Sequence, residues 1–262
     1  MTTGEQKDRL RSLLAAARSN EPERHAEVAK QLRTSSVLEA LDSKADYVNA
    51  AKFRLRVAQV VEALARNTTP SAHEAFLSLT ANDVFLAEDE RTMSLVRASV
   101  HIRPAPPALV AFWDRHSQPE DGFSPTTITT LIDNGSPPAL ALFEKKMLDP
   151  AHEDNDKVAW MRTRILSHRN DVALLETCER LLRALPEHLR PLLVEVLFDY
   201  RPGEWFRPAT GASAPPLESA SRPALELLIR IGTAALTSAP LTAEQRAAVE
   251  LRLQEARKLR ER

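Results

Sequence analysis

The sequence predicts an all-α protein arranged as an α–α superhelix, a short solenoid of antiparallel helix pairs. Leucine and alanine, which favour helix, recur at helical spacing along most of the chain. Helix starts recur at steps of 36, 31 and 34 residues along the series Pro70, Pro106, Pro137 and Asp171. The chain has only 6 glycines beside 18 prolines, whereas a large β-sandwich or barrel needs more glycine for its turns.

Residues 170–200 show the repeating unit best. Apolar side chains at residues 174–185 form one stripe at helical spacing, and Asp171 stands where an N-cap is expected. Pro186 ends this helix, and a second apolar stripe follows at residues 189–197. Two such helices joined by a tight turn still have apolar surface to bury, so we expect similar pairs before and after them.

The first 66 residues are predicted to form an N-terminal helical cap. Apolar spacing and helix-breaking residues place its helices at residues 4–19, 22–33, 35–41 and 44–66. The sequence does not show how these helices pair with one another.

Residues 69–200 are predicted to hold the repeats, each with a first helix and a second apolar helix. The second helices are predicted at residues 88–102, 125–133, 156–167 and 188–199. Two of them also carry strand signals, because residues 96–102 alternate polar and apolar side chains and residues 126–131 are rich in β-branched residues. Both segments fall on the second helix of a repeat, so we predict helix for both.

The repeat period breaks at residues 201–221. This stretch is rich in Pro, Ala and Ser, and loops of this length are uncommon in compact domains. A C-terminal helix pair is predicted within residues 222–262, with helices at 222–237 and 241–262. Thr242 and Gln245 have the spacing of a capping box at the start of the last helix.

The unit at residues 138–166 resembles a HEAT repeat, and the resemblance extends more loosely over residues 69–200. Such repeats have an apolar first helix, an Asp near the turn, and a Val with a basic neighbour opening the second helix. The matching residues are Leu142, Phe143, Leu148, Asp149-Pro150, Lys157-Val158-Ala159 and Ile165-Leu166. The turn is longer here, because residues 151–155 are added. The resemblance implies a right-handed superhelix that most often binds a protein partner along one face.

Composition and charge exclude several classes of protein. The net charge of −1 gives no general attraction for nucleic acid or anionic lipid, so neither is an expected partner. No run of about 18 apolar residues is present, and the first twelve residues do not resemble a secretory signal. Cys178 is the single cysteine and lies in an apolar stripe, which predicts an unreactive buried thiol. We therefore expect a cytoplasmic protein.

The segment His152-Glu153-Asp154-Asn155-Asp156 concentrates side chains that could bind a metal ion. Its spacing matches neither the HExxH zinc motif nor the EF-hand loop. Adjacent residues rarely converge on one ion. We interpret the segment as a solvated turn whose acids favour the start of the next helix, and we expect no metal and no cofactor.

A basic cluster follows in the next two helices and carries most of the predicted partner-binding residues. Those predicted residues are Arg162, Arg164, Arg169, Arg180, Arg183, Trp205 and Phe206. The arginines could line one face and bind acidic peptide or phosphate. Alternatively, they form a solvated face paired with Glu176, Glu179 and Glu187.

The three tryptophans fall into two groups. Trp113 and Trp160 lie inside predicted helices and are expected in the core. Trp205 and Phe206 lie in the loop at residues 201–221, where they either fold back onto the helices or anchor a partner.

No motif supports an enzyme, because the sequence lacks a GxSxG nucleophile, a P-loop and a dinucleotide fingerprint. The leading hypothesis is a non-catalytic protein–protein interaction module or scaffold that uses a solenoid face, with an acidic segment of another protein as a candidate partner. The alternative is a nucleic-acid- or phosphate-binding HEAT-like protein, including an enzyme similar to the alkylpurine DNA glycosylases. That family binds damaged duplex DNA in a basic concave groove lined by Trp and Asp. Trp113-Asp114 has the same residue types, but adjacent residues on a helix face different ways.

Overall fold

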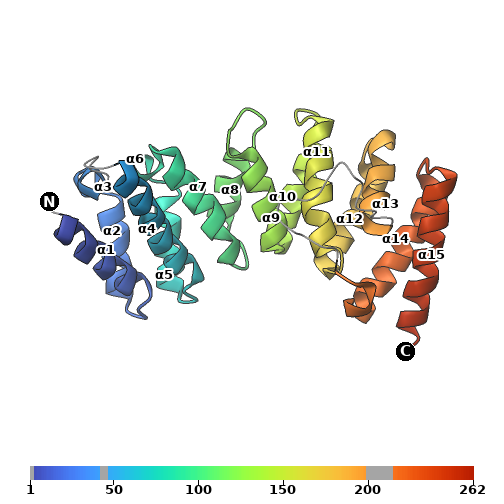
Figure 1. Ribbon diagram of the computed structural model, residues 1–262, viewed down its shortest axis with the longest axis horizontal. Coiled ribbons are helices and arrows are strands. Elements are labelled where there is room, and N and C mark those ends of the chain that lie inside the picture. The colour runs from blue at the N-terminus through green and yellow to red at the C-terminus, as the bar shows by residue number, and fades with distance from the viewer. Residues whose placement is uncertain (1–2, 42–46, 199–214) are drawn as a thin grey trace. The chain divides into compact units, whose positions relative to one another are not determined.

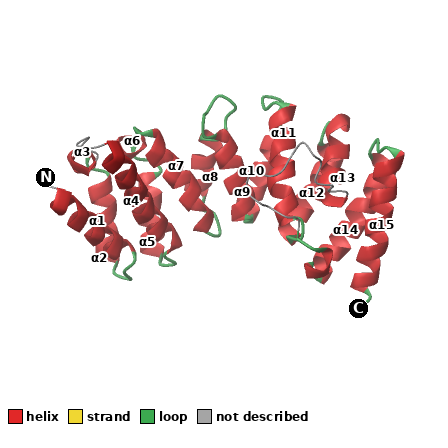
Figure 2. Cartoon of the chain, viewed as in Figure 1, coloured by secondary structure: helices red, strands yellow, loops and turns green. Residues whose placement is uncertain are grey.

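The computed structural model describes residues 3–41, 47–198 and 215–262. Across these residues the chain is helical and contains no strand (Figures 1 and 2), which confirms the all-α prediction. The chain divides into two compact units, residues 1–116 and 117–262. The finer segment boundaries inferred from the sequence stay a prediction.

Unit 1 is made of two layers of helices. Its helices are α1 (Thr3–Ala17), α2 (Pro22–Leu32), α3 (Ser35–Leu41), α4 (Tyr47–Arg66), α5 (Pro70–Leu79), α6 (Asp83–Leu86), α7 (Asp89–Ala98) and α8 (Pro107–Arg115). In one layer α1 packs on α4 and α4 packs on α7, and in the other α2 packs on α5. Because α1 also contacts α2 and α4 contacts α5, the structure supplies the pairing of the N-terminal helices that sequence reasoning lacked.

Unit 2 repeats this two-layer packing. Its helices are α9 (Ser124–Asn134), α10 (Pro137–Leu148), α11 (Asp154–Trp160), α12 (Val172–Ala184), α13 (Arg190–Phe198), α14 (Arg222–Ser238) and α15 (Ala243–Arg260). A π-helical segment, Met161–Ile165, continues α11. One layer runs from α9 through α11 and the π-helical segment to α13 and α15, and the other runs from α10 through α12 to α14.

The two segments with strand signals are helical, as predicted. Residues 96–98 complete α7 and residues 99–101 form a 3₁₀ turn, whereas Ile102, predicted as the last residue of the helix, is already extended. In α9 four of the β-branched residues are threonines, and the hydroxyls of three of them bond back to the preceding turn. Thr127 donates to the Phe123 carbonyl and Thr130 to the Thr126 carbonyl, at 3.0 and 2.9 Å. These bonds satisfy the threonine hydroxyls within the helix.

An asparagine organises the turn between paired helices in both units. The Asn67 Oδ1 atom accepts from the Thr69 backbone N–H at 3.0 Å and the Thr69 hydroxyl at 2.8 Å, just before α5 begins. The Asn134 Oδ1 atom likewise accepts from the Ser136 backbone N–H at 3.2 Å and from the Ser136 hydroxyl at 2.5 Å, just before α10 begins. In that second turn Gly135 adopts the left-handed conformation, with φ of 66°, that ends α9.

Asn67 also joins its turn to the turn of the preceding helix pair. Its Nδ2 atom donates to the carbonyl oxygens of Ala17 and Ser19 at 3.1 and 2.7 Å. Asn170 makes a comparable link in unit 2, where its Nδ2 atom donates to the Pro216 carbonyl at 3.0 Å. Since the last carbonyls of a helix have no partner inside it, the Asn67 amide satisfies the Ala17 carbonyl at the end of α1.

His25 supports the same turns from within unit 1. It is fully buried in α2, and its Nε2 lies 2.9 Å from the Ser19 carbonyl while its Nδ1 lies 2.8 Å from the Ser71 hydroxyl. A carbonyl can only accept, so Nε2 carries the proton and Nδ1 accepts from Ser71. The imidazole therefore ties α2, the α1–α2 turn and α5 together.

The core contains the residues that the sequence assigned to it. Cys178 is fully buried on α12, and Trp113 and Trp160 are 0% and 4% exposed. The Trp113 indole donates to the Ser99 hydroxyl at 2.8 Å, so its polar atom is satisfied. Gly232 lets α14 approach α15 closely, because a Cβ there would lie 2.7 Å from a Leu253 methyl group.

We expect Asn67→Ala to lower the free energy of unfolding by about 2 kcal/mol, because the Ala17 carbonyl and the Thr69 turn lose their partner and the Ser19 carbonyl loses one of two donors. Urea denaturation followed by circular dichroism measures this change. Asn20→Ala is the control, since Asn20 occupies the preceding turn, is exposed and makes no side-chain hydrogen bond with another described residue. It should change stability by less than about 0.5 kcal/mol. Equal effects of the two substitutions would contradict the linking role of Asn67.

We expect a bulky thiol reagent to label Cys178 slowly in the native protein and rapidly in denaturant. Burial raises the pKa of the Cys178 thiol to about 12, so both access and the reactive thiolate are lacking in the folded state. Absorbance of the released chromophore measures the rate at pH 8. Rapid labelling without denaturant would mean that the buried face of α12 is open.

Candidate functional site

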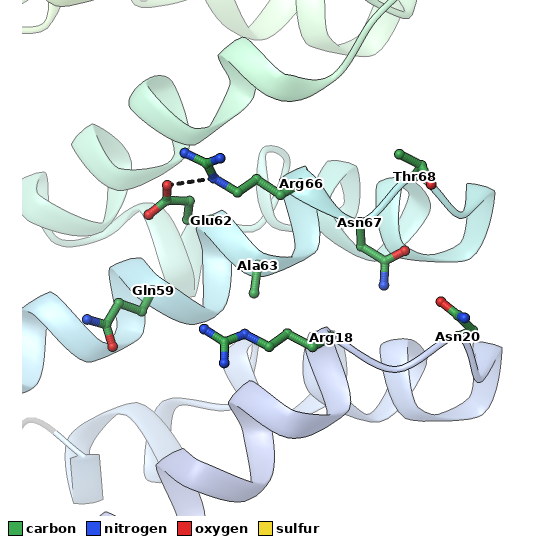
Figure 3. A pocket seen from close by; sticks show the side chains of 8 residues that line it. All are labelled: Arg18, Asn20, Gln59, Glu62, Ala63, Arg66, Asn67 and Thr68. Atoms are coloured by element: carbon green, nitrogen blue, oxygen red, sulfur yellow. Dashed lines mark hydrogen bonds and ion pairs between the residues drawn. The ribbon is translucent and has the colours of Figure 1, made fainter.

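A hollow of about 640 Å³ lies between the C-terminal ends of α1 and α4 (Figure 3). Its lining is polar apart from one alanine. The lining residues are Arg18, Asn20, Gln59, Glu62, Ala63, Arg66, Asn67 and Thr68. Figure 3 shows the Arg18 side chain lying along the gap between the two helices next to Ala63, with Arg66 joined to Glu62 on α4.

The hollow continues along α1 toward its N-terminal part. A second hollow of about 300 Å³ is lined by Lys7, Leu10, Arg11, Leu14 and Gln59. Because Gln59 lines both, we treat them as one feature, the α1–α4 groove. Leu10 is buried and Leu14 is half-buried, so the narrow end of the groove has an apolar floor.

Helical periodicity and the Asn67 contact place these side chains together. Residues spaced by three or four positions share one helix face, as Gln59, Glu62 and Arg66 do on α4. The bond from Asn67 to the Ala17 carbonyl holds the ends of α1 and α4 side by side. Gln59 meanwhile lies beside Leu14. The two helices therefore run parallel, and the groove lies between corresponding faces.

Positive charge predominates in the groove. Glu62 is the carboxylate among the lining residues, and it pairs with Arg66 at 2.8 Å. Arg18 is exposed and its side chain makes no hydrogen bond or ion pair with another described residue. The cationic lining residues are Lys7, Arg11, Arg18 and Arg66.

His101 reports the same potential at the end of α4. Burial first, and then the Arg66 charge, lower the pKa of His101, while Glu62 acts in the opposite direction. At His101 the positive charge of Arg66 thus has a larger effect on the pKa than the negative charge of Glu62. A cation at a helix C-terminus also interacts favourably with the helix dipole, which explains an arginine at this end but not the hollow beside it.

The described lining residues of the groove offer hydrogen-bonding, charged and apolar groups to a ligand. Guanidinium, amide and hydroxyl groups at its wide end can donate hydrogen bonds to carboxylates, and arginine does so through two parallel bonds. Glu62, its lining carboxylate, is already paired with Arg66. The α1–α4 groove can therefore bind an anionic group at its wide end and an apolar group at its narrow end.

Sequence reasoning missed this groove because it could not pair α1 with α4. Arg18 and Arg66 are 48 positions apart in the chain. The available signal was the basic face of α1, where Lys7, Arg11 and Arg18 recur at helical spacing. That signal alone is equally typical of a solvated helix face.

Two of the predicted partner-binding arginines join helices within one layer of unit 2. Arg162, in the π-helical segment, lies 3.6 Å from Glu195 on α13. Arg164 lies 3.5 Å from Asp133 on α9. Both pairs are about one-third exposed, so each contributes modestly, within about 1 kcal/mol.

Two more predicted arginines lie in the other layer of unit 2. Arg180 lies 2.8 Å from Glu144 on α10, and Arg183 lies 3.2 Å from Glu179 within α12. Glu179 also accepts from Arg230 on α14 at 2.6 Å, and this hydrogen bond lowers the pKa of its carboxyl group. The cluster is therefore divided between two layers instead of forming one stripe, and its partner-binding role stays a prediction.

Arg169 differs from the others because its side chain is buried. Its Nε and Nη2 atoms donate to the Pro215 carbonyl at 3.1 and 2.7 Å. Burial and then the neighbouring Arg252 lower the pKa of Arg169. The contact fixes the segment that precedes α14. Trp205 and Phe206, the remaining predicted residues, lie outside the described residues.

The acidic segment around His152 does not form a metal site in the structure. His152 is buried and packs edge-on against Trp160, with a ring-centroid distance of 5.1 Å. Asp154 instead faces outward and lies 2.7 Å from the His188 Nε2 atom. Across the described residues, no three His, Cys, Asp or Glu side chains gather as a metal site would require.

None of the described helices combines the length and hydropathy needed to cross a bilayer. Comparison of the chain with protein-family models, with curated proteins and with solved structures gives no significant match. The candidate site therefore rests on the geometry of the groove.

We expect the stability of the protein to fall as the pH is lowered below 6.5, in part through His152. Burial is the largest influence on the pKa of His152 and lowers it from 6.5. The charges of Asp149 and Asp156 raise this pKa, and those of Lys146 and Lys157 lower it further, so the net change is downward. The unfolded chain therefore binds a proton that the folded chain resists, and stability is lost as pH falls through 6.5.

Denaturation at pH 7.5 and pH 5 measures this loss, and His152→Phe should reduce it because the ring contacts Trp160 without a hydrogen bond. Some pH dependence should remain from His101, whose pKa is lowered as well. An unchanged difference between the two pH values in the variant would exclude His152 as the titrating group.

Proposed function

We propose that this chain is a non-catalytic protein–protein interaction module, a short HEAT-like α-solenoid, that binds an acidic segment of another protein in the α1–α4 groove. One observation carries the proposal. Arg18 is an exposed cation without a partner among the described residues, and it lines a hollow together with amide and hydroxyl donors. The cytoplasmic location expected from the sequence belongs to the same proposal.

The packing of each unit supports the solenoid part of the proposal. In both units consecutive helix pairs stack in two layers, so that each pair buries its apolar faces against its neighbours. The same asparagine turn appears at Asn67 in one unit and at Asn134 in the other. A recurring turn with a recurring layer order is typical of repeat architectures.

The dimensions of the groove suit a short peptide segment. From Lys7 to Arg18, α1 advances about 17 Å at 1.5 Å per residue. An extended chain covers that length with about five residues, since it advances about 3.3 Å per residue. A groove of this size holds a linear segment of a partner protein more readily than it holds a folded surface.

The mixed character of the groove favours an acidic peptide over a nucleic acid. Leu10 and Leu14 line the narrow end, where a peptide can place an apolar side chain. The arginines of unit 2 are less suitable, because Arg162, Arg164, Arg180 and Arg183 already face carboxylates.

We expect Arg18→Glu to reduce binding of acidic peptides at least tenfold. The experiment selects peptides from a displayed random library on the full chain, and then measures fluorescence anisotropy of labelled selected peptides. Arg97→Glu is the matched control, because Arg97 is exposed in unit 1, lies outside the groove lining and carries the same charge change. It should leave the affinity within about twofold.

The outcomes separate the two functional hypotheses. Enrichment of Asp and Glu, with binding lost in Arg18→Glu only, supports the proposal. Selected peptides without acidic residues, or equal binding by both variants, overturn it. Tighter binding of a single-stranded oligonucleotide than of every selected peptide, again lost in Arg18→Glu, would replace it with the phosphate-binding alternative.

A further inference from the structure

The two ends of the α1–α4 groove differ in chemistry. At the wide end Arg18 lies beside Asn20 and Thr68, which are all exposed and polar. At the narrow end Leu10 and Leu14 provide apolar surface between Lys7 and Arg11. A ligand that fills the groove therefore meets hydrogen-bond donors at one end and apolar carbon at the other.

We infer that the groove recognises a bipartite motif: an extended segment with an acidic side chain at the Arg18 end and a large apolar side chain on Leu10 and Leu14. This inference rests on the proposed function and specifies the ligand class for that site. The acidic group supplies charge complementarity. The apolar side chain supplies selectivity, because acidic residues alone would bind most exposed arginines.

The geometry of α1 sets the spacing of the motif. Leu14 and Leu10 precede Arg18 by four and eight positions, so they lie about 6 and 12 Å away along the helix axis. An extended peptide advances about 3.3 Å per residue. The acidic and apolar side chains should therefore be two to four residues apart in the partner.

The narrow end is preformed to receive such a side chain. Leu10 is held in the core of unit 1 with an exposed fraction of 4%, so it forms a fixed floor. Leu14 is half-buried one turn further along and borders the hollow of about 300 Å³. Leu14 retains exposed apolar surface, and its burial contributes affinity in proportion to the area covered. Lys7 and Arg11 can cover the bound side chain with the apolar parts of their own.

A series of synthetic peptides tests the spacing on the unmodified full chain. Each labelled peptide carries two adjacent glutamates and one leucine in a Gly/Ser background, with the leucine one to eight positions from the nearer glutamate. Fluorescence anisotropy should give the highest affinity at spacings of two to four. Replacing that leucine by serine should lower the affinity about tenfold. An affinity that is independent of the spacing, or of the leucine, overturns the inference while leaving acidic binding intact.

Protein variants locate the two halves of the motif. Leu14→Ser should reduce the affinity for the best peptide about tenfold and leave the serine-substituted peptide unchanged. Arg18→Glu should weaken both peptides. Leu251→Ser is the matched control, because Leu251 is a 66% exposed leucine on α15 in unit 2 and should change neither. Loss of both peptides in Leu14→Ser, with native circular dichroism, would also overturn the inference.

A crosslinking measurement needs no change in the apolar floor. Cys178 is buried, so a cysteine introduced by Thr68→Cys or Lys7→Cys is the reactive thiol. A chloroacetyl group next to the glutamates should react with the cysteine at position 68, and one next to the leucine with the cysteine at position 7. The opposite pattern overturns the proposed orientation. No binding of any acidic peptide would instead overturn the proposed function itself.

Discussion

The contact between consecutive inter-helix turns determines how the helix pairs stack. The Asn67 Oδ1 atom accepts hydrogen bonds in the turn that starts α5, and its Nδ2 atom donates to the end of α1. One side chain therefore links the α4–α5 pair to the α1–α2 pair. Its energy is that of a few hydrogen bonds, and one of them satisfies the Ala17 carbonyl at the end of α1, which has no partner inside the helix. Because the ends of α1 and α4 are held together there, the wide end of the groove has a fixed position.

The described arginines differ in their partners. Several of those in unit 2 bridge neighbouring helices, as Arg180 does to Glu144 and Arg230 to Glu179. Each such pair is weak at a partly exposed site, but several along a layer favour one register of stacking. Arg18 differs from these, since no described side chain neutralises it. A cation without a carboxylate partner among the described residues is available to an external anion.

The groove joins two features that a linear peptide can use at once. A buried imidazole and an asparagine support the turn that carries the residues after α1, so the polar end is rigid. The apolar end is formed by Leu10 and Leu14, which are turned toward the core by the periodicity of α1. Preorganised surfaces of this kind lose less conformational entropy on binding than mobile ones, which favours recognition of a segment that is itself flexible.

The amino-acid sequence by itself determined the local structure of this protein. The starts of α5 and α10 at Pro70 and Pro137, the Asp171 cap and the capping box at Thr242 all depend on interactions within about four residues. Burial of Cys178 followed from the same periodicity. Periodicity tells which face of a helix is buried but not which helix covers it. The partners of Asn67 and Arg180, and the meeting of Arg18 with Gln59 and Arg66, therefore depended on long-range packing, which only the tertiary structure decided.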